Sequence, residues 1–386
     1  MRPALACCLG TVIVLLVGDA YVSLLGEITS KCGGRQGLMA ASAAMPKNPK
    51  SPSTLQSKSA TSTNASVQPL FCSEVLQGPL AKSDPNVGVI YGKKTTTDPS
   101  FTIALHNKTI DHTRWAIMTY GFYYERFITE RAVEIMGPTS NTTPGIFLDV
   151  GMNIGWFSLL AAALGRDVVA FEPNPINYFR MCQSVGLNGW SSPGGYDDAS
   201  RINLRIFPFG VGAKPTHLTL VQPLNNPGGS SFHGDEAPVS SIDGASINDI
   251  RVVTLDDVAK ELRWYDEPKT QIAILKVDVE GYDPEVFEGA EELLSSGLVK
   301  NIFMEYSFES GANAKERLGN MIRRIVTCGY KVCAVGNWNG AKLLHETAYA
   351  QHAEKKGADQ LAEALHHMVS VKKVGSRQYN LEWTRR

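Results

Sequence analysis

The residues best suited to chemistry begin with a glycine-containing segment. Residues 149–155, with the sequence DVGMNIG, follow the apolar run IFL and precede the helical pattern WFSLLAAAL. Glycines at such a strand-to-helix turn permit a tight bend and a close approach of a ligand to the backbone. In α/β folds, ligands bind at the carboxyl ends of the sheet strands, where such turns lie. We therefore expect four residues to form a ligand site: Asp149, Gly151, Asn153 and Gly155.

A second carboxylate, Glu172, stands 21 positions after Gly151 (172 − 151), just past the apolar run DVVAF. A carboxylate in this place can accept hydrogen bonds from both hydroxyls of a ribose. Asn153 stands where the dinucleotide fingerprint G-x-G-x-x-G has its second glycine, and Asp149 adds a negative charge, so both disfavour a diphosphate. The competing interpretation is a plain turn followed by a solvated strand end.

A third group of charged residues lies on the run IAILKVDV, a predicted strand over residues 272–279. Side chains alternate along a strand, so Lys276, Asp278 and Glu280 share one face. Charges on a central strand are costly unless they pair or bind a ligand. Glu305, at the end of the next predicted strand, is expected beside them.

Two kinds of chemistry fit these carboxylates. Asp278 and Glu280 could take a proton from a hydroxyl group as a general base. Alternatively, Asp278, Glu280 and Glu305 could bind a divalent metal such as magnesium, which would acidify the hydroxyl; no metal ligand is assigned. For Lys276 we favour an ion pair that supports the site.

The elements that must position these residues follow an alternating pattern. Short apolar runs alternate with helical segments, which predicts a mostly parallel sheet with helices on both faces. Strands are expected at residues 146–150, 167–171, 203–207, 217–221, 272–279, 299–306, 330–335 and 379–383. Helices are expected at residues 156–164, 176–186, 254–262, 284–296 and 312–329, with a further helix within residues 120–136.

Taken together, four motifs resemble the FkbM family of methyltransferases. They are FLDVGMNIGWFS, FEPNP, LKVDVEGYDPEVFEGA and IFMEYS, in this order between residues 145 and 307. The resemblance implies a Rossmann-like class I methyltransferase fold with a seven-stranded sheet, S-adenosylmethionine as cofactor, and O-methylation of sugars or other hydroxylated metabolites. It also implies that Asp149, Gly151, Asn153 and Gly155 hold the methionine end of the cofactor and that Glu172 holds its ribose. Asp278 is expected among the cofactor-binding residues as well. Met152 departs from the alanine usual in the family.

The family's Gly-Ser loop resembles residues 226–231, with the sequence NPGGSS. This loop either faces the cofactor or acceptor, or is an ordinary surface turn. The sequence leaves both interpretations open.

The N-terminal part of the chain suggests where in the cell the protein is located. Residues 4–18 are apolar and uncharged, and residues 31–70 contain no Asp or Glu. We expect a signal anchor or signal peptide at residues 1–30, a disordered Ser/Thr/Pro-rich stem at 31–75, a helical cap at 76–144 and the FkbM-like domain at 145–386. Sequons at Asn64, Asn107 and Asn141 favour a lumenal domain in the Golgi or endoplasmic reticulum. A plastid protein and a secreted protein are the alternatives.

The composition limits the classes of molecule that the protein is expected to bind. The formal net charge is −1, which does not favour nucleic acid as a partner; we expect a small-molecule or glycan substrate, and a membrane through the N-terminal segment if it is not cleaved. The seven cysteines predict neither a disulfide framework nor a zinc site. Two other functions remain open: a nicotinamide-dependent oxidoreductase on the same sheet, and a non-catalytic binding protein.

Overall fold

The computed structural model describes residues 67–80, 91–106, 111–137, 145–190, 203–223, 226–232, 244–266, 270–307, 313–336 and 378–385. All of them belong to the unit Ser66–Arg386. The expected N-terminal apolar segment and the three sequons lie outside the described residues. Within the described part of the chain, no helix combines the length and the apolar character needed to cross a membrane.

A seven-stranded sheet forms the centre of this unit, in the order β12-β13-β11-β10-β3-β4-β5. Neighbouring strands are parallel, except that β13 runs antiparallel to both β11 and β12. The strands are β3 (Ile146–Val150), β4 (Val168–Phe171), β5 (Leu204–Phe207), β10 (Ile272–Val277), β11 (Val299–Ser307), β12 (Tyr330–Gly336) and β13 (Gln378–Arg385). The predicted mostly parallel seven-stranded sheet is confirmed.

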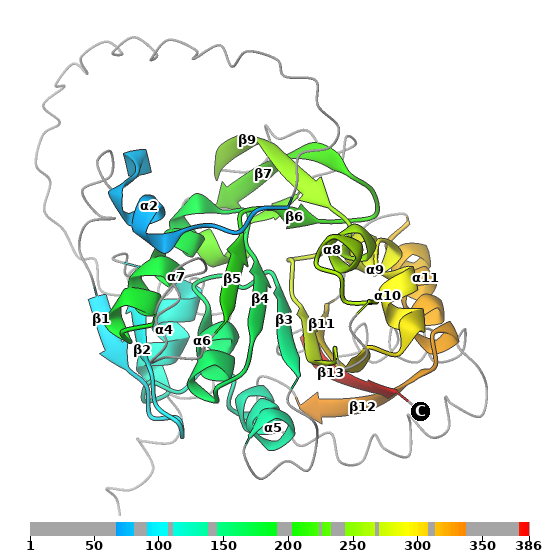
Figure 1. Ribbon diagram of the computed structural model, residues 1–386, viewed down its shortest axis with the longest axis horizontal. Coiled ribbons are helices and arrows are strands. Elements are labelled where there is room, and N and C mark those ends of the chain that lie inside the picture. Colours follow the sequence, from blue (N-terminus) through cyan, green and yellow to red (C-terminus); the bar gives the residue numbers. More distant parts are fainter. Residues whose placement is uncertain are drawn as a thin grey trace, which may run out of the picture. The chain divides into compact units, whose positions relative to one another are not determined.

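Helices cover both faces of the sheet, because the strand side chains alternate between two apolar cores. Along β3, Phe147 packs into one core whereas Leu148 and Val150 pack into the other. The first core includes α6 (Trp156–Ala163) and α7 (Pro175–Leu187); the second includes α8 (Leu255–Glu261), α9 (Asp283–Glu288), α10 (Glu291–Ser296) and α11 (Ala314–Thr327). Figure 1 shows α8 to α11 gathered together, away from α6 and α7. The predicted Rossmann-like, two-faced architecture is therefore confirmed.

The region before the sheet is not purely helical. It contains a hairpin of β1 (Tyr91–Lys94) and β2 (Thr102–Leu105), followed by α4 (His112–Thr119) and α5 (Arg126–Met136). The helix expected within residues 120–136 begins only at Arg126. Arg131 of α5 makes a two-pronged ion pair with buried Glu382 of β13, with Nε–Oε2 and Nη2–Oε1 distances of 2.9 and 3.0 Å. This pair joins the cap to the sheet.

A second, four-stranded sheet was not predicted. Its order is β6-β9-β7-β8, from β6 (Gly210–Val211), β7 (Thr216–Pro223), β8 (Ser231–Phe232) and β9 (Gly244–Val253). It follows β5 directly and lies beyond the carboxyl ends of β3 to β5 (Figure 1). The strand β9, with the sequence GASINDIRVV, lacks the apolar alternation by which strands are found.

Two predicted boundaries were wrong. The strand expected to reach residue 279 ends at Val277, because the chain then turns through Glu280 and Gly281, both with positive φ. The helix expected over residues 284–296 is divided into α9 and α10 at Gly289. A Cβ at Gly289 would lie 2.1 Å from the carbonyl oxygen of Gly212, so this close approach to a neighbouring backbone requires glycine.

The predicted stem, residues 31–75, extends too far. Val67 is buried in the core, the backbone N–H of Leu70 donates to the carbonyl of Ile206 at 2.7 Å, and α2 (Cys72–Gln77) begins inside the expected stem. Cys72 forms a disulfide with Cys182 of α7 across a Cα–Cα distance of 5.0 Å. Sequence spacing did not identify this pair, because its members are 110 residues apart. Cys328 is free and buried.

The Cys72–Cys182 bond should stabilise the fold measurably. A cross-link over so long a loop typically contributes about 2–5 kcal/mol, because it restricts the unfolded chain. We expect Cys72→Ser to lower the free energy of unfolding by this amount in urea titrations. Dithiothreitol should lower the midpoint of the wild type but leave that of the variant unchanged. Equal midpoints for the wild type and the variant without reductant would contradict the prediction.

Candidate functional site

A cavity of about 230 Å³ opens at the carboxyl ends of β3, β4, β10 and β11. Its lining comes from three parts of the chain: the cap, the central sheet and the four-stranded sheet. The residues are His112, Thr113, Tyr124, Glu125, Val150, Gly151, Asn153, Phe171, Glu172, Pro173, Asn177, Phe209, Gly210, Val211, Leu220, Asn226, Gly228, Ser230, Ser231, Phe232, Asp278, Val279, Glu280 and Glu305. The structure thus brings Gly151, Asn153, Glu172, Asp278, Glu280 and Glu305 of the predicted site to one cavity.

The turn after β3 depends on glycine for two different reasons. Gly151 has a φ of 81°, and a Cβ there would lie 1.9 Å from the carbonyl oxygen of Asp278. Gly155 has a φ of 90°, and a Cβ there would lie 2.2 Å from Sδ of Met181. Gly151 therefore lets the ends of β3 and β10 approach at the cavity. Gly155 lets α6 begin against α7; it does not line the cavity, in contrast to its predicted position.

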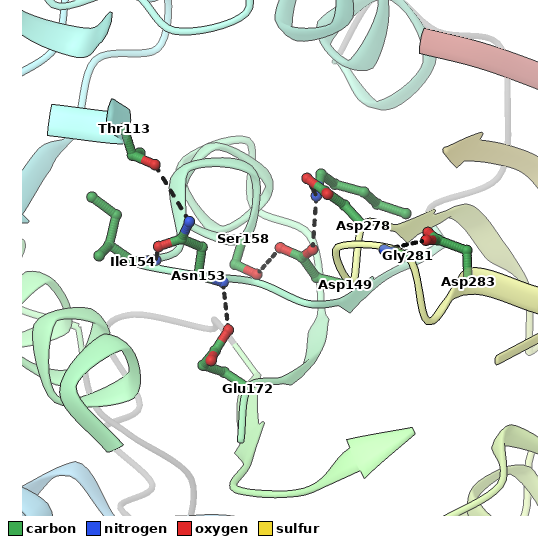
Figure 2. A network of polar contacts seen from close by, with 10 residues as sticks. Thr113, Asp149, Asn153, Ile154, Ser158, Glu172, Asp278, Gly281 and Asp283 are labelled. Carbon is green, nitrogen blue, oxygen red and sulfur yellow. Dashed lines mark hydrogen bonds and ion pairs between the residues drawn. The ribbon is translucent and has the colours of Figure 1, made fainter. Parts of the chain in front are cut away.

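Glu172 is the most completely bonded acid of the site. Its Oε2 accepts a hydrogen bond from the N–H of Asn153 at 2.8 Å, and its Oε1 accepts from the N–H of Asn174 at 2.9 Å. Figure 2 shows Asn153 between Thr113 and Glu172. Burial raises the pKa of Glu172 to about 7, against the lowering effect of these hydrogen bonds. The carboxylate holds the two turns together and still faces the cavity.

Asp149 lies behind the turn and not in the cavity wall. It is 1% exposed, and its Oδ2 accepts a hydrogen bond from Ser158 Oγ of α6 at 2.6 Å. Its other oxygen, Oδ1, is 4.0 Å from Nζ of Lys276. Figure 2 shows Asp149 directed toward Ser158, whereas Glu172 lies on the other side of the turn. Asp149 is therefore not among the residues that line the cavity, and its contact with a ligand stays a prediction.

Lys276 supports the site through ion pairs, as expected. Its Nζ is 3.0 Å from Oδ2 of Asp278 and 5.4 Å from the centre of the Phe157 ring. Burial lowers the pKa of Lys276, but the negative charges of Asp278, Asp149 and Glu125 outweigh that effect and hold it above its ordinary value. The ammonium group therefore stays charged and fixes Asp278 at the edge of the cavity.

Glu280 and Glu305 also reach the cavity. The pKa of Glu280 is raised by the protein packed around it and by the charges of Asp278 and Asp283, although the residue is exposed to solvent. Burial, followed by the charges of Asp278 and Glu280, raises the pKa of Glu305 well above its ordinary value.

The cap supplies four cavity residues that were not predicted: His112 and Thr113 of α4, and the neighbouring pair Tyr124 and Glu125. Burial and the charge of Asp278 raise the pKa of Glu125 to about 7, against the lowering effects of Lys276 and of a hydrogen bond from Tyr124. The sequence around that pair, GFYYERF, carries no motif. Their proximity to the sheet arises from tertiary packing, which local sequence patterns do not encode.

The loop NPGGSS faces the cavity, which resolves the two interpretations of it. Asn174 Nδ2 donates to Ser230 Oγ at 2.9 Å and to Gln222 Oε1 at 3.0 Å. A Cβ at Gly228 would lie 2.6 Å from Asn153 Nδ2. The loop therefore packs directly on the turns that carry Asn153 and Glu172.

A preformed metal site is not seen in the parts of the chain that the structure describes. No group of three or more His, Cys, Asp or Glu side chains there is arranged to hold an ion. The metal interpretation of Asp278, Glu280 and Glu305 therefore gains no support from their geometry.

Three comparisons with known proteins point to methyltransferases. Residues 149–332 match the family model of the methyltransferase FkbM domain. The chain is 28% identical over 212 residues to methyltransferase sdnD of Sordaria araneosa, covering 49% of this chain and 76% of that protein. It is also similar to a solved structure described as a SAM-dependent methyltransferase from Streptococcus mutans, with 9% identity and a TM-score of 0.34, over 77% of this chain and 56% of that one. The predicted resemblance to the FkbM family is confirmed for residues 149–332, which match its methyltransferase domain, and the curated relative is likewise a methyltransferase.

Proposed function

We propose that the protein transfers a methyl group from S-adenosylmethionine to a hydroxyl group of a sugar or glycan. The observation that carries this proposal is the position of Glu172, a buried carboxylate that faces the cavity beside the Gly151 turn. A carboxylate that closes the second strand of such a sheet suits the two hydroxyls of a ribose.

The charge of the cavity fits a cationic nucleoside better than a dinucleotide. Glu125, Glu172, Asp278, Glu280 and Glu305 face it, and neither Lys nor Arg is found among its described lining residues. A diphosphate would meet these carboxylates without a cation to bind it. S-adenosylmethionine carries a sulfonium and an ammonium group, so the same charges attract it. An oxidoreductase that uses NAD is therefore the weaker candidate.

The side chains that line the cavity also suit S-adenosylmethionine. Phe171, Phe209 and Phe232 provide apolar surface near Glu172, suited to an adenine ring. Oδ1 of Asn226 is buried and has no hydrogen-bond partner within the described residues, so it is an acceptor left for a ligand donor. Oε2 of Glu172 accepts one hydrogen bond, from the N–H of Asn153, and retains capacity for a second donor, whereas Oε1 accepts from the N–H of Asn174 and, at 3.4 Å, from Nδ2 of Asn177.

The protein's own task in this reaction is to position the acceptor and to handle its proton. The methyl donor, once bound, supplies a carbon already activated by the adjacent sulfonium. The acceptor must then lie in line with that carbon. Asp278, fixed by Lys276, and the neighbouring Glu280 and Glu305 provide acceptors and donors for the hydroxyls of a polyhydroxylated substrate.

The chain is further proposed to act in the lumen of the secretory pathway. The Cys72–Cys182 disulfide supports this proposal, since such bonds persist in oxidising compartments and are rare in the cytosol. The uncharged apolar run at residues 4–18 and the three sequons point the same way. Golgi or endoplasmic reticulum membrane is the proposed location; a plastid and secretion remain the alternatives.

Ligand-dependent melting separates the candidate functions. At about 0.1 mM, roughly 100 times a micromolar Kd, S-adenosylmethionine should stabilise the fold by about 2.7 kcal/mol and raise Tm by a few degrees. NAD and NADP at the same concentration should give no shift. A rise in Tm with NAD or NADP and none with S-adenosylmethionine would contradict the proposal.

Glu172→Gln should weaken the binding of S-adenosylmethionine. A hydrogen bond to a charged group contributes about 1.5–3 kcal/mol, so Kd should rise roughly 10- to 100-fold in isothermal titration calorimetry. Glu288→Gln, an exposed change on α9 outside the cavity, is the matched control and should keep the wild-type Kd. Unaltered affinity of the folded Glu172→Gln protein would argue against the ribose contact.

The acceptor class is tested by transfer of a tritium-labelled methyl group to fractionated extracts. We expect label in glycan or glycosylated fractions, released by treatments that cleave methyl ethers and not by mild base that cleaves methyl esters. The assay with and without a chelator measures metal dependence. Binding of S-adenosylmethionine with no labelled product in any fraction would favour a non-catalytic protein.

A further inference from the structure

Glu125 occupies the N-cap position of α5 but does not cap the helix. Its backbone is left-handed, with φ 40° and ψ 59°, and its side chain makes no capping hydrogen bond. A residue with a Cβ adopts this conformation at a cost, and such strain is concentrated at functional sites. The carboxyl group instead lines the cavity.

Buried groups hold this strained backbone in place. The N–H of Thr129 donates to the carbonyl of Glu125 at 2.9 Å, and Thr129 Oγ1 donates to the carbonyl of Tyr124 at 2.7 Å. Trp156 Nε1 of α6 in turn donates to Thr129 Oγ1 at 3.0 Å. Thr129 and Trp156 are both buried. The position of Glu125 is therefore fixed by the core and does not depend on the cap alone.

The charged groups around Glu125 come from three directions. Lys276 and Asp278 approach from β10 and its end, Glu280 from the turn that follows, and Glu305 from β11. Asp278 is bound to Lys276. Burial and the charges of Asp278 and Glu280 raise the pKa of Glu305 well above its ordinary value, and Glu280 is exposed to solvent. With a pKa raised to about 7, Glu125 is ionised in a large fraction of molecules near neutral pH and still basic enough to accept a proton.

We propose that Glu125 is the catalytic base of the methyl transfer and takes the proton of the acceptor hydroxyl; this inference rests on the proposed function. A lone pair of the acceptor oxygen forms the bond to the methyl carbon, and the carbon–sulfur bond breaks with its electron pair going to sulfur. The hydroxyl proton passes to the carboxylate of Glu125, which becomes a neutral acid. The base thus comes from the cap, outside the residues 149–332 that match the family domain.

The first test measures stability and needs no acceptor. An acid whose folded pKa is raised from 4.5 to about 7 loses its stabilising contribution as pH rises through this interval. Glu125→Gln keeps the backbone strain but removes the charge. Its Tm should equal that of the wild type near pH 4.5 and exceed it by several degrees at pH 8. Glu130→Gln, an exposed change on the same helix, should follow the wild-type curve at every pH.

The second test measures methyl transfer from tritium-labelled S-adenosylmethionine to the extract fraction that the wild type labels. The wild-type rate should fall as pH drops below about 7, because the base becomes protonated. Glu125→Gln should be about 100-fold slower or more and should lose this dependence, with a Kd for S-adenosylmethionine within threefold of the wild type. Glu130→Gln should keep the wild-type rate and pH profile.

The outcomes separate the two proposals. A Glu125→Gln protein that binds S-adenosylmethionine and keeps the wild-type rate and pH profile refutes the base role alone. A variant less stable than the wild type at every pH refutes it too, because that result indicates a structural role. A wild type that neither binds S-adenosylmethionine nor labels any fraction refutes the proposed function, and the base role with it.

Discussion

One carboxylate, Glu172, holds the two turns of the site together. It accepts the backbone N–H of Asn153 after β3 and that of Asn174 at the start of α7. Asn174 in turn binds Ser230 and Gln222, so the four-stranded sheet is joined to the same point. If Glu172 moved, the turn, the helix start and the loop NPGGSS would lose their common partner.

The second constraint is the excess of acid at the carboxyl edge of the sheet. Lys276 is the buried cation that offsets Asp278 and Asp149, and the other carboxyl groups around the cavity have raised pKa values. Burial of such groups costs stability, as is typical of sites retained for function. The charged residues also differ in position: Asp149 and Lys276 lie behind the cavity wall, while Glu125, Asp278, Glu280 and Glu305 line the cavity.

Much of the fold could be read from the sequence because the central strands are short apolar runs between amphipathic helices. The strand at residues 146–150 was predicted at its observed bounds, and Glu172 was found because a carboxylate after the second strand has a physical role in this fold. Asp149 and Gly155 belong to the predicted motif, but in the structure neither of them lines the cavity. Which side of a turn a side chain faces depends on packing partners such as Ser158 and Met181, which lie outside the motif in the sequence and meet it only in the folded structure.

Three features required the tertiary structure. The apolar alternation of strand β9 is interrupted, Cys72 and Cys182 lie far apart in the chain, and Glu125 belongs to a segment without a motif. Each depends on long-range contacts, which outweigh local preference where the two differ. The cap is also where acceptor recognition would differ among relatives, since loops and additions around a common sheet carry specificity.

The most direct measurement is a crystal structure of the full chain with S-adenosylhomocysteine, the demethylated product. We expect both ribose hydroxyls within hydrogen-bond distance of the Glu172 carboxylate, with the sulfur facing the edge formed by Asp278, Glu305 and Glu125. A nucleoside bound elsewhere, or a ribose turned away from Glu172, would contradict the assignment of this cavity as the methyl-donor site.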